Sequence, residues 1–514
     1  MQKTALVFVV GLLFASICVA QLAPDSGFSV SQFVVEGDNP LSATDTDDTL
    51  APYLGELEGF QDLKAASQAL QERLYKQGYT SHRVIIPEQT LRGGMVTLRV
   101  IIFRLGDIQI EGNQYFSTEN IRASLPALET GKSPDTKELS RQLMLANDHP
   151  SKSLALTFHE SDQPQTIDAS LEVDDYRPLS VYGSFNNYSS IDTPDTRLIA
   201  GLQHSNLFNR DHVLTATATS SPDDWSAVEQ YGADYRIPLY RLSGDLSFYY
   251  IYSDVDSGRV AGGFNVSGQG KFFGGRYKQH LTRFGNYSHS ASLKIEDNQF
   301  INDTIFAGTP IGDDVRSRPL SISYAGVYRF SKGVTDFFIN YEHNLSGGSN
   351  NNDAAYAVNR FGAKQDWDAW QLGATLDYSL VKGWLLHGRL DAQYSDEPLI
   401  PGEQFGVGGA YSVRGYHERI VAGDSGIAAS LEVWTPPVKY DIRAIGFVDA
   451  GYSKRKDTLP GESDSENLLS IGAGLRWFWA RNFSLQLDLA HTLSDAGADD
   501  SGDTRVIFNL VARY

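Results

Sequence analysis

Residues 405–416 read FGVGGAYSVRGY, a stretch too rich in glycine for a helix and too irregular for a strand. Its one charged residue, Arg414, lies between aromatic residues. We therefore expect a structured loop that holds an arginine in one place. A surface arginine in an ordinary long loop is the alternative interpretation.

The stretch GFVDAG at residues 446–451 has the alternation of a β-strand. Because side chains alternate between the two faces of a strand, Phe447, Asp449 and Gly451 share the face opposite the apolar one. A loop arginine and an inward strand carboxylate are natural partners. We predict a charge-assisted pair between Arg414 and Asp449 that fastens the loop to the strand.

Together the two segments resemble the Val-Arg-Gly-Phe/Tyr loop and the Phe-x-Asp-x-Gly strand of the POTRA-plus-barrel outer-membrane superfamily. That superfamily includes barrel insertases and the two-partner secretion transporters (TpsB) of the hemolysin secretion/activation type. The resemblance implies that the loop folds back into the barrel lumen, where its arginine meets the strand aspartate. The residues concerned are Val413, Arg414, Gly415 and Tyr416 in the loop, Phe447, Asp449 and Gly451 in the strand, and Glu432 as a second inward carboxylate for Arg414.

Composition is that of a folded protein larger than one ordinary domain, with 514 residues, 41% apolar and 11% aromatic. After Ala20 no run approaches the ~20 apolar residues that a membrane-spanning helix needs. The formal net charge of -20 argues against nucleic acid or an anionic membrane surface as a partner.

The first twenty residues have the features of a secretory signal peptide. A lysine at position 3 precedes an apolar run, and Cys18-Val19-Ala20 ends it with a small residue. Ile17 argues against a lipoprotein signal, which needs a small residue before the cysteine. Cys18 is the only cysteine, so the mature chain is expected to have no disulfide. Residues 21–27 are expected to be a short tail, with no room for the plug helix found in some TpsB transporters.

Two small α+β modules are predicted next, at residues 28–103 and 104–175. The first has the order strand, helix, helix, strand, strand, with an apolar helical stripe that includes Leu70 and Leu74 and stops at Gly78. The second repeats this order, with Ser117 and Asp135 as helix N-caps. The phrase around Pro87 and Gln89 is similar to the Pro-x-Gln signature of the first POTRA domain of TpsB proteins.

Residues 176–514 predict a transmembrane β-barrel of about sixteen antiparallel strands. Helical stripes disappear, and alternating segments of 9 to 15 residues replace them. In one of these, apolar residues alternate with small or polar ones from Leu469 to Trp477. Such lengths suit the ~9 to 11 residues of a tilted strand that crosses a bilayer. Short and long connections alternate, as expected for turns on opposite sides of a membrane. Residues 355–364 remain open as loop or strand.

The same alternation makes residues 398–425, which contain Arg414, the sixth external connection. The resemblance implies that this connection folds inward. The last alternating segment ends on Tyr514. An aromatic at the end of the last strand resembles the signal by which the barrel assembly machinery recognises its clients. We expect that machinery to insert this chain into outer-membrane lipid.

No catalytic constellation, cofactor motif or metal site is found in the sequence, so the chain is not predicted to be an enzyme. Asp424-Ser425 lies in a Gly-Asp-Ser-Gly phrase, but Ile427 and the lack of a suitable histidine break the protease pattern. His417-Glu418 lacks the second histidine of a zinc helix. The acidic residues between 495 and 503 are interpreted as a solvated loop rather than a cation site.

By the resemblance, the chain is an outer-membrane pore that exports one large, β-rich exoprotein, a TpsA-like client whose N-terminal secretion domain is first caught by periplasmic POTRA domains. The physical route proposed for this capture is addition of an extended client segment to an exposed strand edge. The candidate residues are Arg83, Val84, Ile85 and Ile86 in a strand and Leu70 and Leu74 in a helix groove, with the two leucines as ordinary core residues as the alternative.

Two other functions compete with export. A factor that assembles or inserts other barrels would use the seam between the first and last strands rather than the lumen. A passive porin would have no use for periplasmic modules.

Overall fold

The computed structural model describes residues 27–514 apart from residues 92, 192, 255–257, 260–264, 267–268, 302–304, 307–308, 311–313 and 480–481. The predicted signal peptide, residues 1–20, and residues 21–26 of the predicted tail lie outside the described residues. Contacts divide the chain into two units, Met1–Tyr176 and Arg177–Tyr514.

The first module has a three-stranded sheet in the order β2-β5-β4, with β2 parallel and β4 antiparallel to β5. Helix α2 ends at Gly78, as predicted, and the φ of 99° at this residue suits glycine. Leu70 and Leu74 of α2 are both 0% exposed and pack in the module's core. The elements are β1 (Phe28–Val30), β2 (Gln32–Gly37), α1 (Ala43–Leu50), η1 (Ala51–Tyr53), β3 (Gly55–Leu57), α2 (Phe60–Gln77), β4 (His82–Ile85) and β5 (Met95–Ile102).

The second module repeats this arrangement with the sheet order β6-β8-β7. Its helices begin at the predicted caps, because the Ser117 hydroxyl accepts from the Asn120 N–H and the Asp135 carboxylate accepts from the Glu138 N–H. The elements are β6 (Arg104–Glu111), α3 (Thr118–Ala123), α4 (Thr136–Asn147), β7 (Lys152–Glu160) and β8 (Thr166–Asp175).

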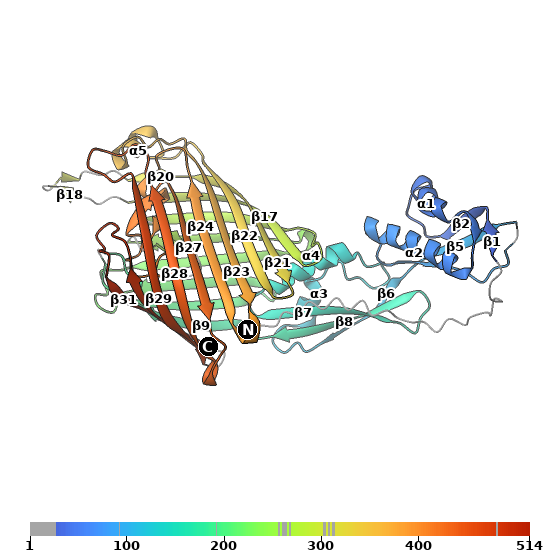
Figure 1. Ribbon diagram of the computed structural model, residues 1–514. Coiled ribbons are helices and arrows are strands. Elements are labelled where there is room, and N and C mark those ends of the chain that lie inside the picture. Colours follow the sequence, from blue (N-terminus) through green and yellow to red (C-terminus); the bar gives the residue numbers. More distant parts are fainter. Residues whose placement is uncertain are drawn as a thin grey trace. The chain divides into compact units, whose positions relative to one another are not determined.

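The second unit is a closed antiparallel barrel, which confirms the predicted fold class (Figure 1). Seventeen labelled segments form the ring, and β20 and β21 both pair with β17 as parts of one strand, which leaves sixteen strands. The segments are β9 (Leu179–Asn186), β10 (Arg197–Leu207), β11 (His212–Ser220), β12 (Gln230–Leu239), β13 (Gly244–Ser253), β16 (Gly270–His280), β17 (Tyr287–Phe300), β20 (Val315–Ser317), β21 (Pro319–Phe330), β22 (Gly333–Asn344), β23 (Asp368–Ser379), β24 (Leu385–Tyr394), β27 (Ser425–Trp434), β28 (Ile442–Lys454), β29 (Ser465–Trp479), β30 (Phe483–Thr492) and β31 (Thr504–Arg513).

The ring closes between its last and first strands. β31 pairs with β9 from Arg513 opposite Tyr182 to Asn509 opposite Asn186. One further pair of bonds extends this seam, because the Tyr514 N–H donates to the Val181 carbonyl at 2.8 Å and the Val181 N–H donates to the Tyr514 carbonyl at 2.9 Å. No described helix has the length and apolar composition that would carry it across a membrane.

Side chains alternate around the barrel wall as predicted. Val448 is 50% exposed on the outside of β28, whereas Asp449 beside it is 0% exposed. On β27, Leu431 is 53% exposed and its neighbour Glu432 is buried. An apolar outside and a polar inside are typical of a barrel that faces lipid and encloses water.

Connections between the strands alternate in length. The short ones are residues 208–211, 240–243, 281–286, 331–332, 380–384, 435–441 and 480–482. The long ones, called external loops 1 to 8 in chain order, are residues 187–196, 221–229, 254–269, 301–314, 345–367, 395–424, 455–464 and 493–503. The connection that carries Arg414 is therefore external loop 6.

Residues 355–364, for which the sequence left loop or strand open, belong to no strand of the barrel. They lie in external loop 5, which contains helix α5 (Asp353–Asn359). The Asn352 side chain caps this helix by accepting from the Ala355 N–H. The remaining short elements lie in the connections: η2 (Tyr240–Leu242), β14 (Gly258–Arg259), β15 (Asn265–Val266), β18 (Ile305–Phe306), β19 (Thr309–Pro310), η3 (Val381–Gly383), η4 (Pro401–Glu403), β25 (Phe405–Val407), β26 (Val421–Gly423) and η5 (Lys439–Asp441).

Candidate functional site: the loop across the barrel lumen

External loop 6 is a folded hairpin rather than an open coil. Its strands β25 and β26 pair from Phe405 opposite Gly423 to Val407 opposite Val421. Gly415, beside Arg414 at the tip, has a φ of 99°, and a Cβ there would lie 3.1 Å from Cγ2 of Thr492 on β30. Only glycine fits both the backbone conformation and the close approach to the wall.

Arg414 is the centre of the loop's contacts with the wall. Its Nε donates to Oδ2 of Asp449 at 2.7 Å, and its Nη2 donates to Oδ1 of the same carboxylate at 2.8 Å. The backbone N–H of Arg414 adds a bond to Oδ2 at 3.1 Å. The structure therefore brings together the two residues that the sequence paired, in a bidentate arrangement.

Glu432, the second predicted carboxylate, also reaches Arg414. Its Oε1 lies 2.7 Å from Nη1 of Arg414. The Arg414 guanidinium lies 3.5 Å from the centre of the Phe447 ring, close enough for a cation–π contact. Three strand positions thus hold the arginine by charge, hydrogen bonding and ring contact.

The small residue of the Phe-x-Asp-x-Gly strand has a steric role. A Cβ on Gly451 would collide with the side chains of Val407 and Val413 in the loop. Val413 and Tyr416 are buried in an apolar cluster with Val407. Gly451 therefore leaves the space in which the loop's valines pack.

Two further charged residues of this site were not identified from the sequence. Asp488 on β30 lies 3.3 Å from Nη1 of Arg414, and Arg476 on β29 donates to Asp488 Oδ2 at 2.9 Å. Both are charged residues at inward positions of strands whose outward positions are apolar. That contrast is the signal that would have found them.

The tip of loop 6 is also attached to the wall and loops beyond β30. The Tyr416 hydroxyl donates to the Ser494 carbonyl of loop 8 at 2.7 Å. The His417 ring lies 2.6 Å from Oδ1 of Asp499 and also contacts Arg505 on β31. The Glu418 N–H donates to the Ser189 carbonyl of loop 1 at 3.0 Å.

The beginning of loop 6 is attached to the opposite side of the ring. Glu403 accepts a hydrogen bond from Ser317 on β20 and another, at 3.5 Å, from Asn298 on β17. With β9 as the first strand, β17 is the seventh and β31 the sixteenth. Loop 6 therefore extends across the lumen from one half of the ring to the other.

Two carboxyl groups of this loop have pKa values above the ordinary value of a glutamate. Burial raises the pKa of Glu418 to about 7 from its ordinary 4.5, although the N–H of Ala410, which donates to its Oε1 at 2.7 Å, opposes the shift. Burial likewise raises the pKa of Glu403 to about 7. Both groups therefore change charge near neutral pH.

In the first module, the side chain of Gln89, from the predicted Pro-x-Gln phrase, pairs with strand β5 just beyond the end of β4. Gln89 accepts from the Thr97 N–H at 2.7 Å and donates to the Thr97 carbonyl at 2.8 Å. Its amide thus takes the place of a neighbouring strand at the end of β4, two residues after Pro87.

The predicted client-binding residues of this module are less accessible than the sequence suggested. Leu70 and Leu74 are core residues, so their side chains are not available to a client. Val84 and Ile86 pack against the same core, whereas Arg83 and Ile85 are exposed.

The outer edge of β4 is occupied as well. Gln71 of α2 accepts from the Val84 N–H at 2.8 Å and donates to the His82 carbonyl at 2.7 Å. Ser67 donates to the Val84 carbonyl at 3.1 Å. Strand addition at β4 therefore requires the displacement of these side chains, because they fill the positions of a strand partner.

The corresponding strand of the second module has an edge that is only partly covered. Asn147 of α4 accepts from the Leu154 N–H at 2.7 Å and donates to the Leu154 carbonyl at 3.0 Å. Because backbone groups alternate along an antiparallel ladder, those of Leu156 and Phe158 also point away from β8. Among the described residues no group hydrogen-bonds them.

Within the part of the chain that the structure describes, no group of three or more potential ligands could hold a metal ion. Asp499, one of the acidic residues of loop 8, is engaged with His417 instead.

Comparison with known families gives two matches. The family described as haemolysin secretion/activation protein ShlB/FhaC/HecB matches residues 166–477. The family described as POTRA domain, ShlB-type, matches residues 28–102.

Relatives that match most of the chain include outer-membrane transporters named CdiB. The one from Dickeya dadantii (strain 3937) is 22% identical over 443 residues, which cover 83% of this chain and 77% of the relative. The one from Escherichia coli O6:K15:H31 (strain 536 / UPEC) is 24% identical over 495 residues, which cover 87% and 76%.

Solved structures share the fold. CdiB from Escherichia coli has a TM-score of 0.79 at 18% identity, over 98% of this chain and 93% of that one. BamA from Haemophilus ducreyi lacking POTRA domains 1–3 has a TM-score of 0.51 at 15% identity, over 95% and 100%.

Replacement of the central arginine tests the loop's attachment. Arg414→Ala should leave the barrel folded but release the loop tip, because the removal of one partner from a buried ion pair costs about 3 to 5 kcal/mol, less where water enters. We expect faster trypsin cleavage at Arg419 of loop 6 and reduced export of the client.

Arg414→Lys is the matched variant, since it keeps the charge but loses the bidentate geometry and should give an intermediate result. Folding is checked by heat-modifiable mobility in electrophoresis. Unchanged cleavage and export in Arg414→Ala would show that the loop's attachment is unimportant.

The raised pKa of Glu418 predicts that loop docking depends on pH. The docked loop retains a proton that an undocked loop releases above about pH 4.5, so docking is strongest at low pH and weakens as the pH rises through about 7. Trypsin cleavage at Arg419 should therefore rise from pH 6 to pH 8 more steeply than in Glu418→Gln. Equal pH profiles for the two proteins would refute the prediction.

Proposed function

The chain belongs to the haemolysin secretion/activation family ShlB/FhaC/HecB, and we propose that its two N-terminal modules receive one large, β-rich exoprotein, which the barrel then passes outward. The chain is an outer-membrane translocation pore of the two-partner secretion type, with its POTRA region in the periplasm. The client, its secretion domain and the order of events are the proposed part.

The observation that carries this proposal is the loop within the barrel. A closed ring of sixteen strands with an inward polar face is wide enough to enclose water. Loop 6 lies across that space and is held by contacts that can be broken, such as the buried pair of Arg414 and Asp449. A wide barrel with a movable obstruction suits the passage of an extended chain.

Recognition of the client is proposed to occur at the outer edge of β7. An extended segment can add to the free backbone groups of Leu156 and Phe158 without the displacement of any side chain. At β4 the same process would first have to remove Gln71 and Ser67. The edge at β7 therefore replaces the strand at residues 83–86 as the favoured site.

A non-enzymatic role is part of the proposal, and so is insertion of this chain by the barrel assembly machinery. The alternative function is the assembly of other outer-membrane barrels. Depletion of the protein separates the two, because a transporter should lose one exoprotein from the culture medium, while an assembly factor should lose many proteins from the outer membrane. Loss of many barrels with normal export would overturn the proposal.

The β7 edge is tested by a substitution that removes one outward N–H. Phe158→Pro should leave the β7–β8 ladder intact, because the N–H of residue 158 is not part of it. We expect binding of the exoprotein identified by depletion to weaken about tenfold, since a hydrogen bond is lost and the ring obstructs the edge.

Phe158→Val is the matched control, because it shortens the side chain but keeps the N–H, and it should bind normally. Equal binding by the proline and valine variants would exclude this edge.

A further inference from the structure

Asp424, at the junction of β26 and β27, is 0% exposed, and its carboxylate accepts four hydrogen bonds. Oδ1 accepts from the Leu399 N–H at 2.8 Å and from the Gln404 side chain at 3.1 Å. Oδ2 accepts from the Lys456 N–H at 2.8 Å and from Nη2 of Arg360 at 2.9 Å. Asp424 takes no part in the contacts between Arg414 and Asp449.

The four donors come from three external loops. Arg360 belongs to loop 5, Leu399 and Gln404 belong to loop 6, and Lys456 belongs to loop 7. Nη2 of Arg360 also donates to the Lys456 carbonyl at 2.8 Å. One buried carboxylate therefore joins three segments that are far apart in sequence.

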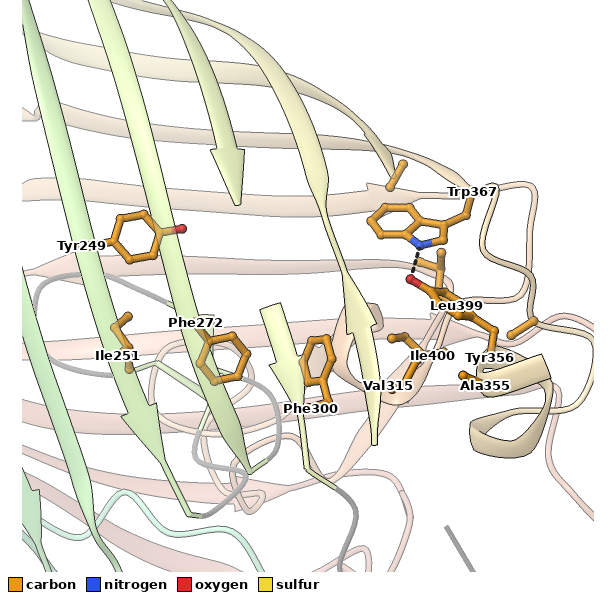
Figure 2. Packing of buried hydrophobic residues seen from close by; sticks show 12 residues of the cluster. Tyr249, Ile251, Phe272, Phe300, Val315, Ala355, Tyr356, Trp367, Leu399 and Ile400 are labelled. Atoms are coloured by element: carbon orange, nitrogen blue, oxygen red, sulfur yellow. Dashed lines mark hydrogen bonds between the residues drawn. The ribbon is translucent and has the colours of Figure 1, made fainter. Parts of the chain in front are cut away.

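Figure 2 shows an apolar cluster that includes Leu399. This cluster lies next to the junction, because the Leu399 N–H donates to Asp424. Tyr356 and Trp367 of loop 5 are nearly or fully buried with Leu399 and Ile400 of loop 6. The same cluster includes Phe300 from the wall strand β17. The Trp367 indole N–H donates to the Tyr356 hydroxyl at 3.4 Å, the bond drawn in Figure 2. The loops thus pack on one another and on the barrel wall.

We propose that Asp424 is a positioning residue that holds external loops 5, 6 and 7 together as a lid on the pore, independently of Arg414. The two side chains contact different parts of the protein. Arg414 contacts the inward faces of β27, β28 and β30, whereas the Asp424 carboxylate accepts hydrogen bonds from loop residues alone. Loop 6 is therefore fastened twice, at its tip and at its base. This inference goes beyond the proposed function, because it concerns the resting pore without a client.

The chemistry of the site allows a conservative test. Both oxygens of Asp424 face donors, two each. In Asp424→Asn, either orientation of the amide directs an NH₂ group at two donors, so at least two hydrogen bonds are lost with almost no change in volume. The lid should open more often while the barrel wall is unaffected.

The experiment measures the conductance of the purified full-length protein in planar lipid bilayers. We expect Asp424→Asn to raise the open probability about tenfold, since bonds to a charged group are lost. Asp396→Asn is the matched control, because it removes another loop 6 carboxylate that pairs with Lys456 but is 69% exposed, and it should behave like the parent protein.

Arg360→Met guards against a folding defect. If Asp424→Asn does not form a heat-modifiable barrel, the conductance of Arg360→Met is the test instead, because this variant removes one donor and keeps the carboxylate. It should give a smaller rise in open probability. If Asp424→Asn, or Arg360→Met where Asp424→Asn does not fold, has the same open probability as Asp396→Asn, then Asp424 does not hold the pore closed.

Independence from Arg414 is tested by combining Asp424→Asn, or Arg360→Met in its place, with Arg414→Ala. For two separate attachments the effects on the logarithm of the open probability should add. A double variant no more open than the stronger single variant would show that the two residues belong to one attachment, which would overturn the proposal of a second one.

Discussion

Every backbone N–H and C=O group in contact with lipid must find its partner within the protein, and the barrel depends on this constraint. It requires the sheet to close on itself, as β31 does on β9. It also determines where an irregular segment can lie at membrane depth. Loop 6 has many backbone groups outside the ladder, so it fits only in the interior, where inward polar side chains and water satisfy them.

The position of loop 6 in the interior also explains why charged residues are buried around Arg414. Arg414, Arg476, Glu432, Asp449 and Asp488 form one buried group of two cations and three carboxylates. Such a group is expensive to bury without partners. Here each member has a partner of opposite sign, and glycine at position 451 lets the loop come close enough to supply Arg414. The steric and electrostatic requirements therefore meet on one strand.

The pairing of Arg414 with Asp449 was predictable because alternation along a strand determines which side chains point inward. The same alternation places Arg476 and Asp488 on inward faces, but their proximity to each other and to Arg414 was not predictable, since it depends on the register of β29 and β30, which alternation alone does not specify. Helix α5 was missed because its seven residues are too short for a clear period. The closed edge of β4 depends on how α2 crosses the sheet, so the role of Gln71 had no sequence signal. The roles in export of Tyr416, Pro87 and Tyr514 stay predictions.

A hollow cylinder of sixteen strands has no packed interior to resist flattening. Loop 6 supplies a strut across it, because the loop is attached to β17 and β20 on one side and to β28 and β31 on the other. In the proposed function, departure of this loop would do more than open the lumen. It would remove the strut, so that the wall would become more deformable when a bulky segment of polypeptide has to pass.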